Sequence, residues 1–324
     1  GTRPPPINIV ALWGVCVHGE AVKSDGAEAA SASAAVNHTL SGKATRERHA
    51  RIHAHIYTYT HTHLSESTPS PSFDRSFRFR RGLPVAGRLI RRRKDRHKCK
   101  VSICDINSEE GEKLAETLST EHGKDRVIFC QCDVTDYSQF EESFQTTFAT
   151  FGHIDIVVNN AGIMNDRFWE LEVDINVNGV IRGTLLAQRF MGTDRGGQGG
   201  IVVNIGSNVS INPYASVPIY SATKAAIVNF TRAFGHQYHV DLTGVKVMAL
   251  CPSATDSKLL GDVSKQLLWA RYVDAWLRDV ASSVPQRSEH VAKALIQILN
   301  TGKSGSVWLV EKDQPAHEIT FPKN

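Results

Sequence analysis

The chain has 324 residues, of which 41% are hydrophobic, and a formal net charge of +4 at pH 7. This length and composition can bury a full core and argue against disorder throughout. The charge is unevenly divided, because the first 100 residues carry +11 and the remainder −7. The sequence contains no run of eighteen apolar residues, so no membrane span is predicted. Its six cysteines show neither CxxC pairs nor a compact secreted-protein spacing, which predicts a cytoplasmic protein and no metal site.

Residues 1–98 show no regular periodicity. Their composition drifts from Ala/Ser-rich to His/Thr-rich, Ser/Pro-rich and Arg-rich, which is typical of disorder. The stretch RIHAHIYTYTHTH at residues 51–63 can be encoded by an alternating dinucleotide repeat, which indicates translated non-coding DNA. The alternative is a genuine extension whose basic cluster at residues 91–98 binds acidic partners, but basic runs are usually just solvated, and nucleic-acid binding is not expected. We expect residues 1–98 to be disordered or to result from an incorrect gene model, and residues 99–324 to form the folded domain.

From residue 99 onward, strand-like and helix-like segments alternate, which predicts an α/β domain with a doubly wound parallel sheet. Asn107 is placed to cap a helix that Gly123 ends. Phe140, Phe144 and Phe148 recur every four residues, which predicts an apolar helix stripe facing the sheet. Six short apolar runs are the expected strands: residues 100–104, 127–132, 154–158, 201–205, 245–250 and 306–310.

Tyr220 and Lys224 form a YxxxK pair in a segment of helical periodicity, so their side chains project one turn apart from the same face. A free phenol has a pKa of about 10 and is a poor base, but an adjacent ammonium stabilises the phenolate. Ser207 lies at the end of the apolar run IVVNIGS, and strand ends of a parallel sheet deliver residues to the ligand crevice. A hydroxyl there can hold a substrate oxygen. The alternative is that Ser207 merely caps the strand end.

Together with NNAG at residues 159–162, these positions resemble the short-chain dehydrogenase/reductase pattern in order and spacing over about residues 99–311. Within that family the chain looks most like NAD-linked 15-hydroxyprostaglandin dehydrogenases and insect alcohol dehydrogenases. The resemblance implies a Rossmann-type fold in which Tyr220 is the general acid/base. It implies that Lys224 assists Tyr220 and binds the nicotinamide ribose, and that Ser207 orients the substrate. It also implies that Asn176 holds a water in the proton relay; alternatively, Asn176 is simply a polar helix residue.

The expected cofactor is NAD. Asp105, which ends the strand VSICD, sits where an acidic side chain accepts from a ribose 2′-hydroxyl and repels a 2′-phosphate. The alternative, a turn residue or helix cap, is compatible with this role. The family pattern usually has PGxxxT after Pro252, but here Ser253 replaces the glycine and Ser257 the threonine. The residues that the resemblance assigns to the cofactor are Asp105, Ile106, Asp133, Val134, Asn160, Ala161, Gly162, Tyr220, Lys224, Pro252 and Thr255.

The resemblance also implies a small alcohol or ketone substrate and a homodimer or homotetramer formed through the helices of Asn176 and Tyr220. An apolar segment follows Thr255 at the position of a substrate lid. It favours a hydrophobic or lipid-like substrate, although ordinary core packing would give the same pattern. Its apolar residues are Leu259, Leu260, Leu267, Leu268, Trp269, Tyr272, Val273, Trp276 and Leu277.

The family's first strand and its glycine loop TGxxxGxG are not recognisable in the sequence. Gly14 with Gly19 lies far from Asp105, and Gly82 with Gly87 has the unsuitable pattern GLPVAGR. A sheet without this central strand would leave backbone groups unpaired, at about 1 to 3 kcal/mol each. Two hypotheses follow: the chain is an NAD-dependent oxidoreductase acting on a secondary alcohol, or it is a catalytically impaired or non-enzymatic protein that keeps the dehydrogenase scaffold.

Overall fold

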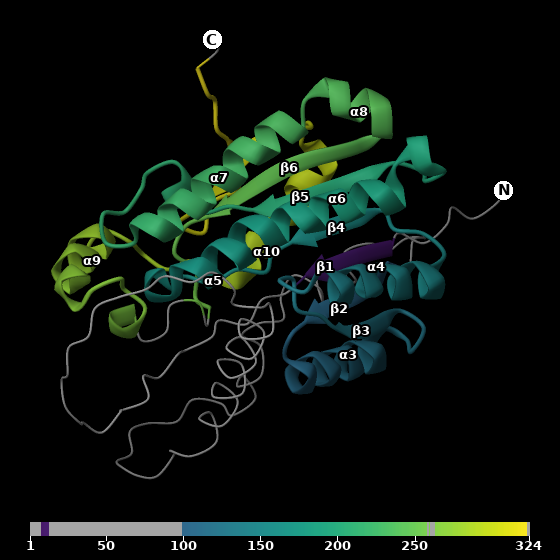
Figure 1. Cartoon of the computed structure of the whole chain (residues 1–324), viewed down its shortest axis with the longest axis horizontal. Helices are drawn as coiled ribbons and strands as arrows, with labels where there is room; N and C mark the ends of the chain where they lie inside the picture. The colour runs from purple at the N-terminus through teal and green to yellow at the C-terminus, as the bar shows by residue number, and fades with distance from the viewer. Residues whose placement is uncertain (1–7, 13–98, 258, 260–262, 323–324) are drawn as a thin grey trace, which may run out of the picture. The chain divides into compact units, whose positions relative to one another are not determined.

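The strands of the described residues form one eight-stranded sheet in the order β3-β2-β1-β4-β5-β6-β7-β8 (Figure 1). The computed structural model describes residues 8–12, 99–257, 259 and 263–322, all of which belong to one unit of the chain. Every pairing is parallel except that of β8 with β7. The strands are β1 (Asn8–Leu12), β2 (Lys100–Asp105), β3 (Val127–Gln131), β4 (Ile156–Asn159), β5 (Gly200–Ile205), β6 (Val245–Pro252), β7 (Val307–Val310) and β8 (His317–Glu318). The predicted α/β class and the six predicted strands are confirmed.

The expectation that the chain lacks its first strand is wrong. β1 lies in the middle of the sheet, where Ile9 stands opposite Val101 of β2 and Ile156 of β4. Parallel neighbours are joined by crossovers and need not be close in sequence, so β1 can pair with β2 despite its long sequence separation from Asp105. The sheet therefore includes residues 8–12, which lie outside the predicted domain of residues 99–324. The disorder predicted for residues 13–98, and the glycine pairs considered there, lie outside the described residues.

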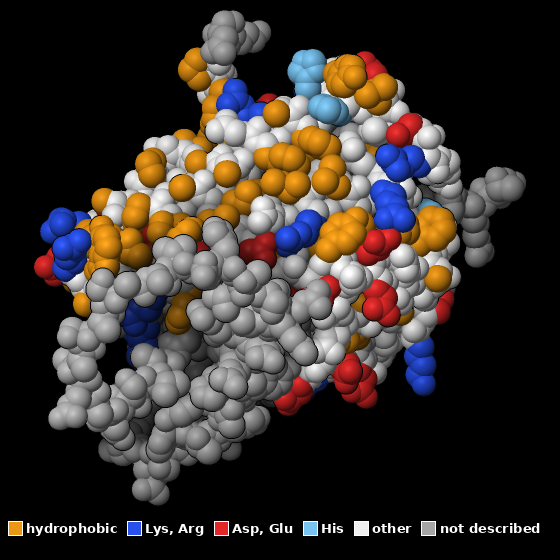
Figure 2. Space-filling view, in the orientation of Figure 1, with side chains coloured by type: hydrophobic (Ala, Val, Ile, Leu, Met, Phe, Trp, Pro, Cys, Tyr) orange, Lys and Arg blue, Asp and Glu red, His pale blue; other side chains and the backbone are white. Residues whose placement is uncertain are grey.

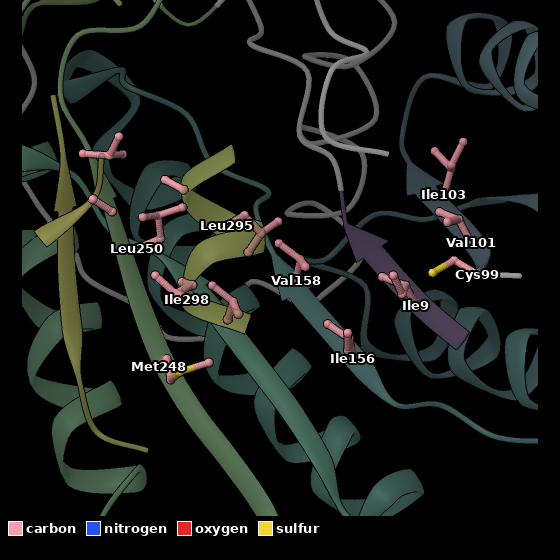
Figure 3. Close-up of a cluster of buried hydrophobic side chains, with 14 of the residues drawn as sticks. Ile9, Cys99, Val101, Ile103, Ile156, Val158, Met248, Leu250, Leu295 and Ile298 are labelled. Carbon is pink, nitrogen blue, oxygen red and sulfur yellow. The ribbon is translucent and has the colours of Figure 1, made fainter. Parts of the chain in front are cut away.

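Helices cover both faces of the sheet, and β1 contributes one buried side chain to each face. Ile9 belongs to the apolar cluster between the sheet and helices α3 and α10 (Figure 3). Val10 belongs to the opposite cluster, which includes side chains of α4 and α6. The helices are α3 (Ser108–His122), α4 (Tyr137–Phe151), α5 (Trp169–Val173), α6 (Val180–Met191), α7 (Pro218–Phe234), α8 (Gln237–Thr243), α9 (Val273–Val280) and α10 (Ser288–Thr301). No helix in the described ranges is long and apolar enough to cross a bilayer.

The predicted cap of α3 is confirmed, whereas the phenylalanine stripe of α4 is only partly right. The side chain of Asn107 accepts a hydrogen bond from the Glu110 amide at 3.1 Å, and Gly123 follows the last turn. Phe140 and Phe144 are fully buried, but Phe148 is 42% exposed. A spacing of four drifts relative to 3.6 residues per turn, so the third phenylalanine has rotated away from the sheet. Phe151 fills the core at that end of α4 instead.

We predict that Ile9→Ala lowers the free energy of unfolding by about 2 to 5 kcal/mol, because it opens a cavity against the central strands. Ile9 is 1% exposed. Chemical denaturation measures the change, and Leu242→Ala, at a side chain that is 51% exposed, is the control. Equal, small effects of both substitutions would mean that β1 does not belong to the sheet.

Candidate functional site

The predicted site residues lie at the carboxyl ends of the parallel strands or on the helices that follow them. The strand order runs from β1 to β2 and β3 on one side, and from β1 to β4, β5, β6 and β7 on the other. The ends of β1 and β4 therefore flank the reversal of strand order at which doubly wound sheets bind ligands. Asp105 ends β2, Asn160 follows β4, and Ser207 follows β5. One edge of the sheet thus collects polar groups from segments far apart in sequence.

Ser207 is 7% exposed and caps the short 3₁₀ turn at Asn208–Ser210. Its Oγ donates to Asn208 Oδ1 at 3.1 Å and accepts from the Val209 amide at 3.4 Å. The Ser207 amide in turn donates to Ser210 Oγ at 3.0 Å. The alternative of a strand-end cap is therefore correct as local structure. It is compatible with a role in binding, because rotation of the hydroxyl hydrogen alone would turn the donor away from Asn208.

Tyr220 and Lys224 project from α7 as the YxxxK spacing predicts, and both are buried. Lys224 Nζ lies 5.7 Å from the centroid of the Tyr220 ring and donates to the Ile205 carbonyl at 3.0 Å. That carbonyl ends β5, two residues before Ser207. The ammonium is therefore held between the strand that presents Ser207 and the ring that carries the phenol.

Asn176 is fully buried in a π-helical turn, Asp174–Gly179, between α5 and α6. Such turns occur frequently at functional sites. Its Nδ2 donates to the Ile163 carbonyl at 2.8 Å and to Thr223 Oγ1 at 3.1 Å, and its Oδ1 accepts from the Ile163 amide at 2.9 Å. Asn176 therefore ties the loop after β4 to α7. Since both Nδ2 hydrogens are engaged, a water could bind this side chain only at Oδ1.

Gly162 lies where the loop after β4 passes between Asn176 and Lys224. A Cβ at this position would stand 3.2 Å from Asn176 Oδ1 and 3.3 Å from Lys224 Nζ. A side chain at this position would crowd both groups, so glycine allows the loop to pass close to them. Asn160 is half-buried and Ala161 is buried in the same loop.

The carboxylates after β2 and β3 both serve local turns. Asp105 is 8% exposed, and its Oδ1 accepts from the Asn107 amide at 2.9 Å. Asp133 Oδ1 accepts from the Thr135 amide at 2.9 Å and from its hydroxyl at 2.7 Å. Asp105 therefore does border a helix start, as the alternative interpretation holds, and it is also the last residue of β2. Ile106 is half-buried beside it, and Val134 is 8% exposed beside Asp133.

The loop after β6 is fixed by Gln286. Thr255 Oγ1 donates to the Ser253 carbonyl at 2.8 Å, and the backbone of Thr255 forms an isolated parallel β-bridge with Gln286. Gln286 Nε2 donates to the Val310 carbonyl of β7 at 2.8 Å. Pro252 is the last residue of β6. The strand end thus continues into an anchored loop although Ser253 replaces the expected glycine.

The predicted lid segment packs partly onto Tyr220. Tyr220, Met164, Val217 and Leu267 are buried in one apolar cluster, against which Leu259, Val263, Tyr272, Val273 and Trp276 pack. Asp279 of α9 holds the loop before α7, because its Oδ2 accepts from the Ser216 amide at 2.9 Å and from its hydroxyl at 2.6 Å. Leu260 lies outside the described residues. Trp269 and Leu277 are exposed, and apolar side chains gather at the surface where Figure 1 places α9 (Figure 2).

Sequence reasoning missed two acidic residues beneath α7. Asp166 is fully buried, and its Oδ2 and Oδ1 accept from the amides of Ile219 and Tyr220 at 2.8 and 3.0 Å. Glu172 is also fully buried, and its Oε1 accepts from the Asn165 amide at 2.8 Å. Nothing in the segment NDRFWELEV distinguishes these two acids from exposed helix residues. In the described ranges, no group of three or more His, Cys, Asp or Glu could hold a metal ion.

Comparison with known sequences agrees with this arrangement. The chain is 35% identical over 178 residues to mouse 15-hydroxyprostaglandin dehydrogenase [NAD(+)], which covers 55% of this chain and 66% of that protein. It is 29% identical over 190 residues to alcohol dehydrogenase 1 of Ceratitis capitata, covering 57% of this chain and 72% of that protein. The chain thus spans about two thirds of the length of these prostaglandin dehydrogenases.

Solved structures share the fold. A dehydrogenase/reductase from Sinorhizobium meliloti 1021 superposes with a TM-score of 0.57 at 20% identity, covering 71% of this chain and 88% of that one. Levodione reductase superposes with a TM-score of 0.56 at 24% identity, covering 65% and 86%. The sequence profile of the family described as "short chain dehydrogenase" matches residues 86–268, more than half of the chain. The chain therefore belongs to the short-chain dehydrogenase family.

Proposed function

We propose that the chain is an NAD-dependent oxidoreductase that transfers a hydride between a secondary alcohol and its ketone. The observation that carries the proposal is that Lys224 Nζ lies beside the Tyr220 ring and bonds the carbonyl of Ile205, two residues before Ser207. Hydroxyl, phenol and ammonium are the groups needed to hold an alcohol oxygen and move its proton. The names of the mouse and Ceratitis relatives, both dehydrogenases, support the same reaction.

In this mechanism the Ser207 hydroxyl turns from Asn208 toward the substrate oxygen and orients it. Tyr220 removes the hydroxyl proton of the alcohol, or returns it to the ketone in the reverse direction. Lys224 stabilises the phenolate form of Tyr220 by its positive charge, which acts strongly because both side chains are buried. Asn176 keeps the loop after β4 fixed against α7. NAD bound at this edge supplies the hydride acceptor.

The residues at the strand ends fit NAD. Asp105 places a carboxylate at the end of β2, where it favours a ribose diol over a 2′-phosphate. Gly162 leaves the space that a Cβ would fill beside Lys224 and Asn176. The mouse relative carries NAD(+) in its name. The residues directly after β1, where the family binds pyrophosphate, lie outside the described residues. The impaired-scaffold alternative loses its argument from unpaired strand edges, because β1 pairs with both β2 and β4. Its other argument, the missing glycine loop, concerns residues outside the described ones.

The substrate that fits best is hydrophobic. Tyr220 is buried in the same cluster as Met164, Val217 and Leu267, so an alcohol that reaches its phenol passes apolar and aromatic side chains. Lipid-like secondary alcohols match this lining. We further expect a cytoplasmic protein, consistent with the free cysteines Cys104, Cys130, Cys132 and Cys251, and a homodimer or homotetramer.

We predict that Tyr220→Phe lowers kcat by about 10²- to 10⁴-fold, because it removes the group that transfers the proton. NADH formation is followed by absorbance with a series of apolar secondary alcohols, and NADH binding by fluorescence should be retained. Tyr238→Phe, at a side chain that is 62% exposed on α8, is the control. Unchanged turnover of Tyr220→Phe would contradict the proposed mechanism.

We also predict that Asp105→Asn lowers the preference for NAD over NADP by about tenfold or more. The amide can still accept from the Asn107 backbone, so the turn is kept while the charge that repels a 2′-phosphate is lost. The ratio of kcat/KM for the two cofactors measures the effect, with the exposed Asp125→Asn as control. An unchanged ratio would show that Asp105 is only a turn residue.

A further inference from the structure

Two acidic side chains without any assigned role are buried under the helix that carries Tyr220 and Lys224. Asp166 and Glu172 are both 0% exposed. Asp166 caps α7 from a distant part of the chain, because its two oxygens accept from the amides of Ile219 and Tyr220. A negative charge at this position also interacts favourably with the positive end of the helix dipole. The ionised form of Asp166 thus has a clear structural use.

Glu172 has no comparable set of partners. Oε1 accepts from the Asn165 amide, whereas Oε2 is buried without a hydrogen-bond partner. The charged groups that face this carboxyl are Asp166, which repels a second negative charge, and Lys224, which attracts it. A buried, ionised oxygen without a donor is costly, whereas a protonated one becomes a donor itself. Burial, followed by the charge of Asp166, raises the pKa of Glu172 to about 8.

We propose that Asp166 and Glu172 form a carboxyl pair that shares one proton at neutral pH and positions Tyr220 by fixing the first turn of α7. The positioning role rests on the proposed function, whereas the shared proton does not. Like charges held close together in a buried site cannot both remain ionised at low cost, so one proton stays with the pair. Glu172 carries that proton, and Asp166 keeps the charge that receives the α7 amides.

The shared proton also preserves the charge balance around Lys224. With Glu172 neutral, the ammonium acts on the Tyr220 ring and on the Ile205 carbonyl. Ionisation of Glu172 would bring a negative charge to bear on Lys224 and repel Asp166 from the start of α7. Both changes would disturb the residue that transfers the proton. The pair therefore couples the position of Tyr220 to pH.

The first experiment compares the stability of the unchanged chain with that of Glu172→Gln between pH 5 and pH 9. The raised pKa means that the folded chain binds a proton that the unfolded chain has released above its ordinary pKa of 4.5. The contribution of Glu172 to stability is thus fully present below pH 4.5, the ordinary pKa of the group, and is lost as the pH rises through about 8. We expect the unfolding constant of the unchanged chain, divided by that of Glu172→Gln, to rise about tenfold per pH unit and to level off above about pH 8.

Glu170→Gln is the matched control, because it makes the same change at an exposed residue of the same helix. The unfolding constant of the unchanged chain, divided by that of Glu170→Gln, should not change with pH. Infrared spectroscopy provides a second measurement that does not depend on reversible unfolding. At pH 7, the carboxylic-acid carbonyl band should be present in the unchanged chain and in Glu170→Gln and reduced in Glu172→Gln. A flat ratio for Glu172→Gln, or an unchanged band, would overturn the shared proton.

Asp166→Asn tests the coupling and the positioning role. Without the Asp166 charge, the acid band of Glu172 should titrate at lower pH, and an unmoved titration would show that the carboxyls do not share a proton. An asparagine also offers only one acceptor oxygen to the two α7 amides. We expect kcat to fall about tenfold to hundredfold with KM for NAD changed less than about threefold. Unchanged kcat would refute positioning, whereas an inactive unchanged chain would refute the proposed function and leave the infrared result standing.

Discussion

The parallel pairing of β1 with β2 on one side and β4 on the other is the constraint on which the rest of the structure depends. Strands of a parallel sheet deliver their functional residues at one edge, so these residues meet only if the central strands hold their register. Without β1, β2 and β3 would have no connection to the part of the sheet that carries Ser207. Ile9 and Val10 then anchor β1 in both layers of the core, because they are buried in apolar clusters on opposite faces of the sheet.

Helix α7 is held from several sides, which gives its two functional residues defined positions. Asn176 bonds to Thr223 from the π-helical turn, Lys224 bonds to the end of β5, and Asp166 receives the amides of the first turn. All three contacts come from segments that follow the loop containing Gly162 in the chain. A helix fixed in this way presents the phenol and the ammonium without a large loss of side-chain entropy at each turnover.

Much of this could be predicted from the sequence, because the information was local. The six apolar strand runs, the Asn107 cap and the one-turn spacing of Tyr220 and Lys224 each depend on residues that are close together in the chain. β1 could not be recognised in this way, since five residues before a long non-periodic segment give no sign of the strands they pair with. Phe148 was misjudged because a spacing of four drifts around a helix.

The buried acids show the same limit at the site. Asp166 accepts from amides more than fifty positions later in the chain, and no local pattern marks such a contact. Glu172 lies in a segment whose neighbour Glu170 is exposed, so composition alone cannot tell the two glutamates apart. Their burial becomes apparent only when α5 and the 3₁₀ turn before it, Asp166–Phe168, are packed against α7.

Amide hydrogen exchange over residues 8–12 tests the central claim most directly. Because β1 is paired along both edges, its amides should exchange as slowly as those of β4 and β5 and should open only with the whole domain. Exchange at the rate of an unprotected chain, with β4 and β5 still protected, would contradict the account, since the segment would then not be the central strand of the sheet.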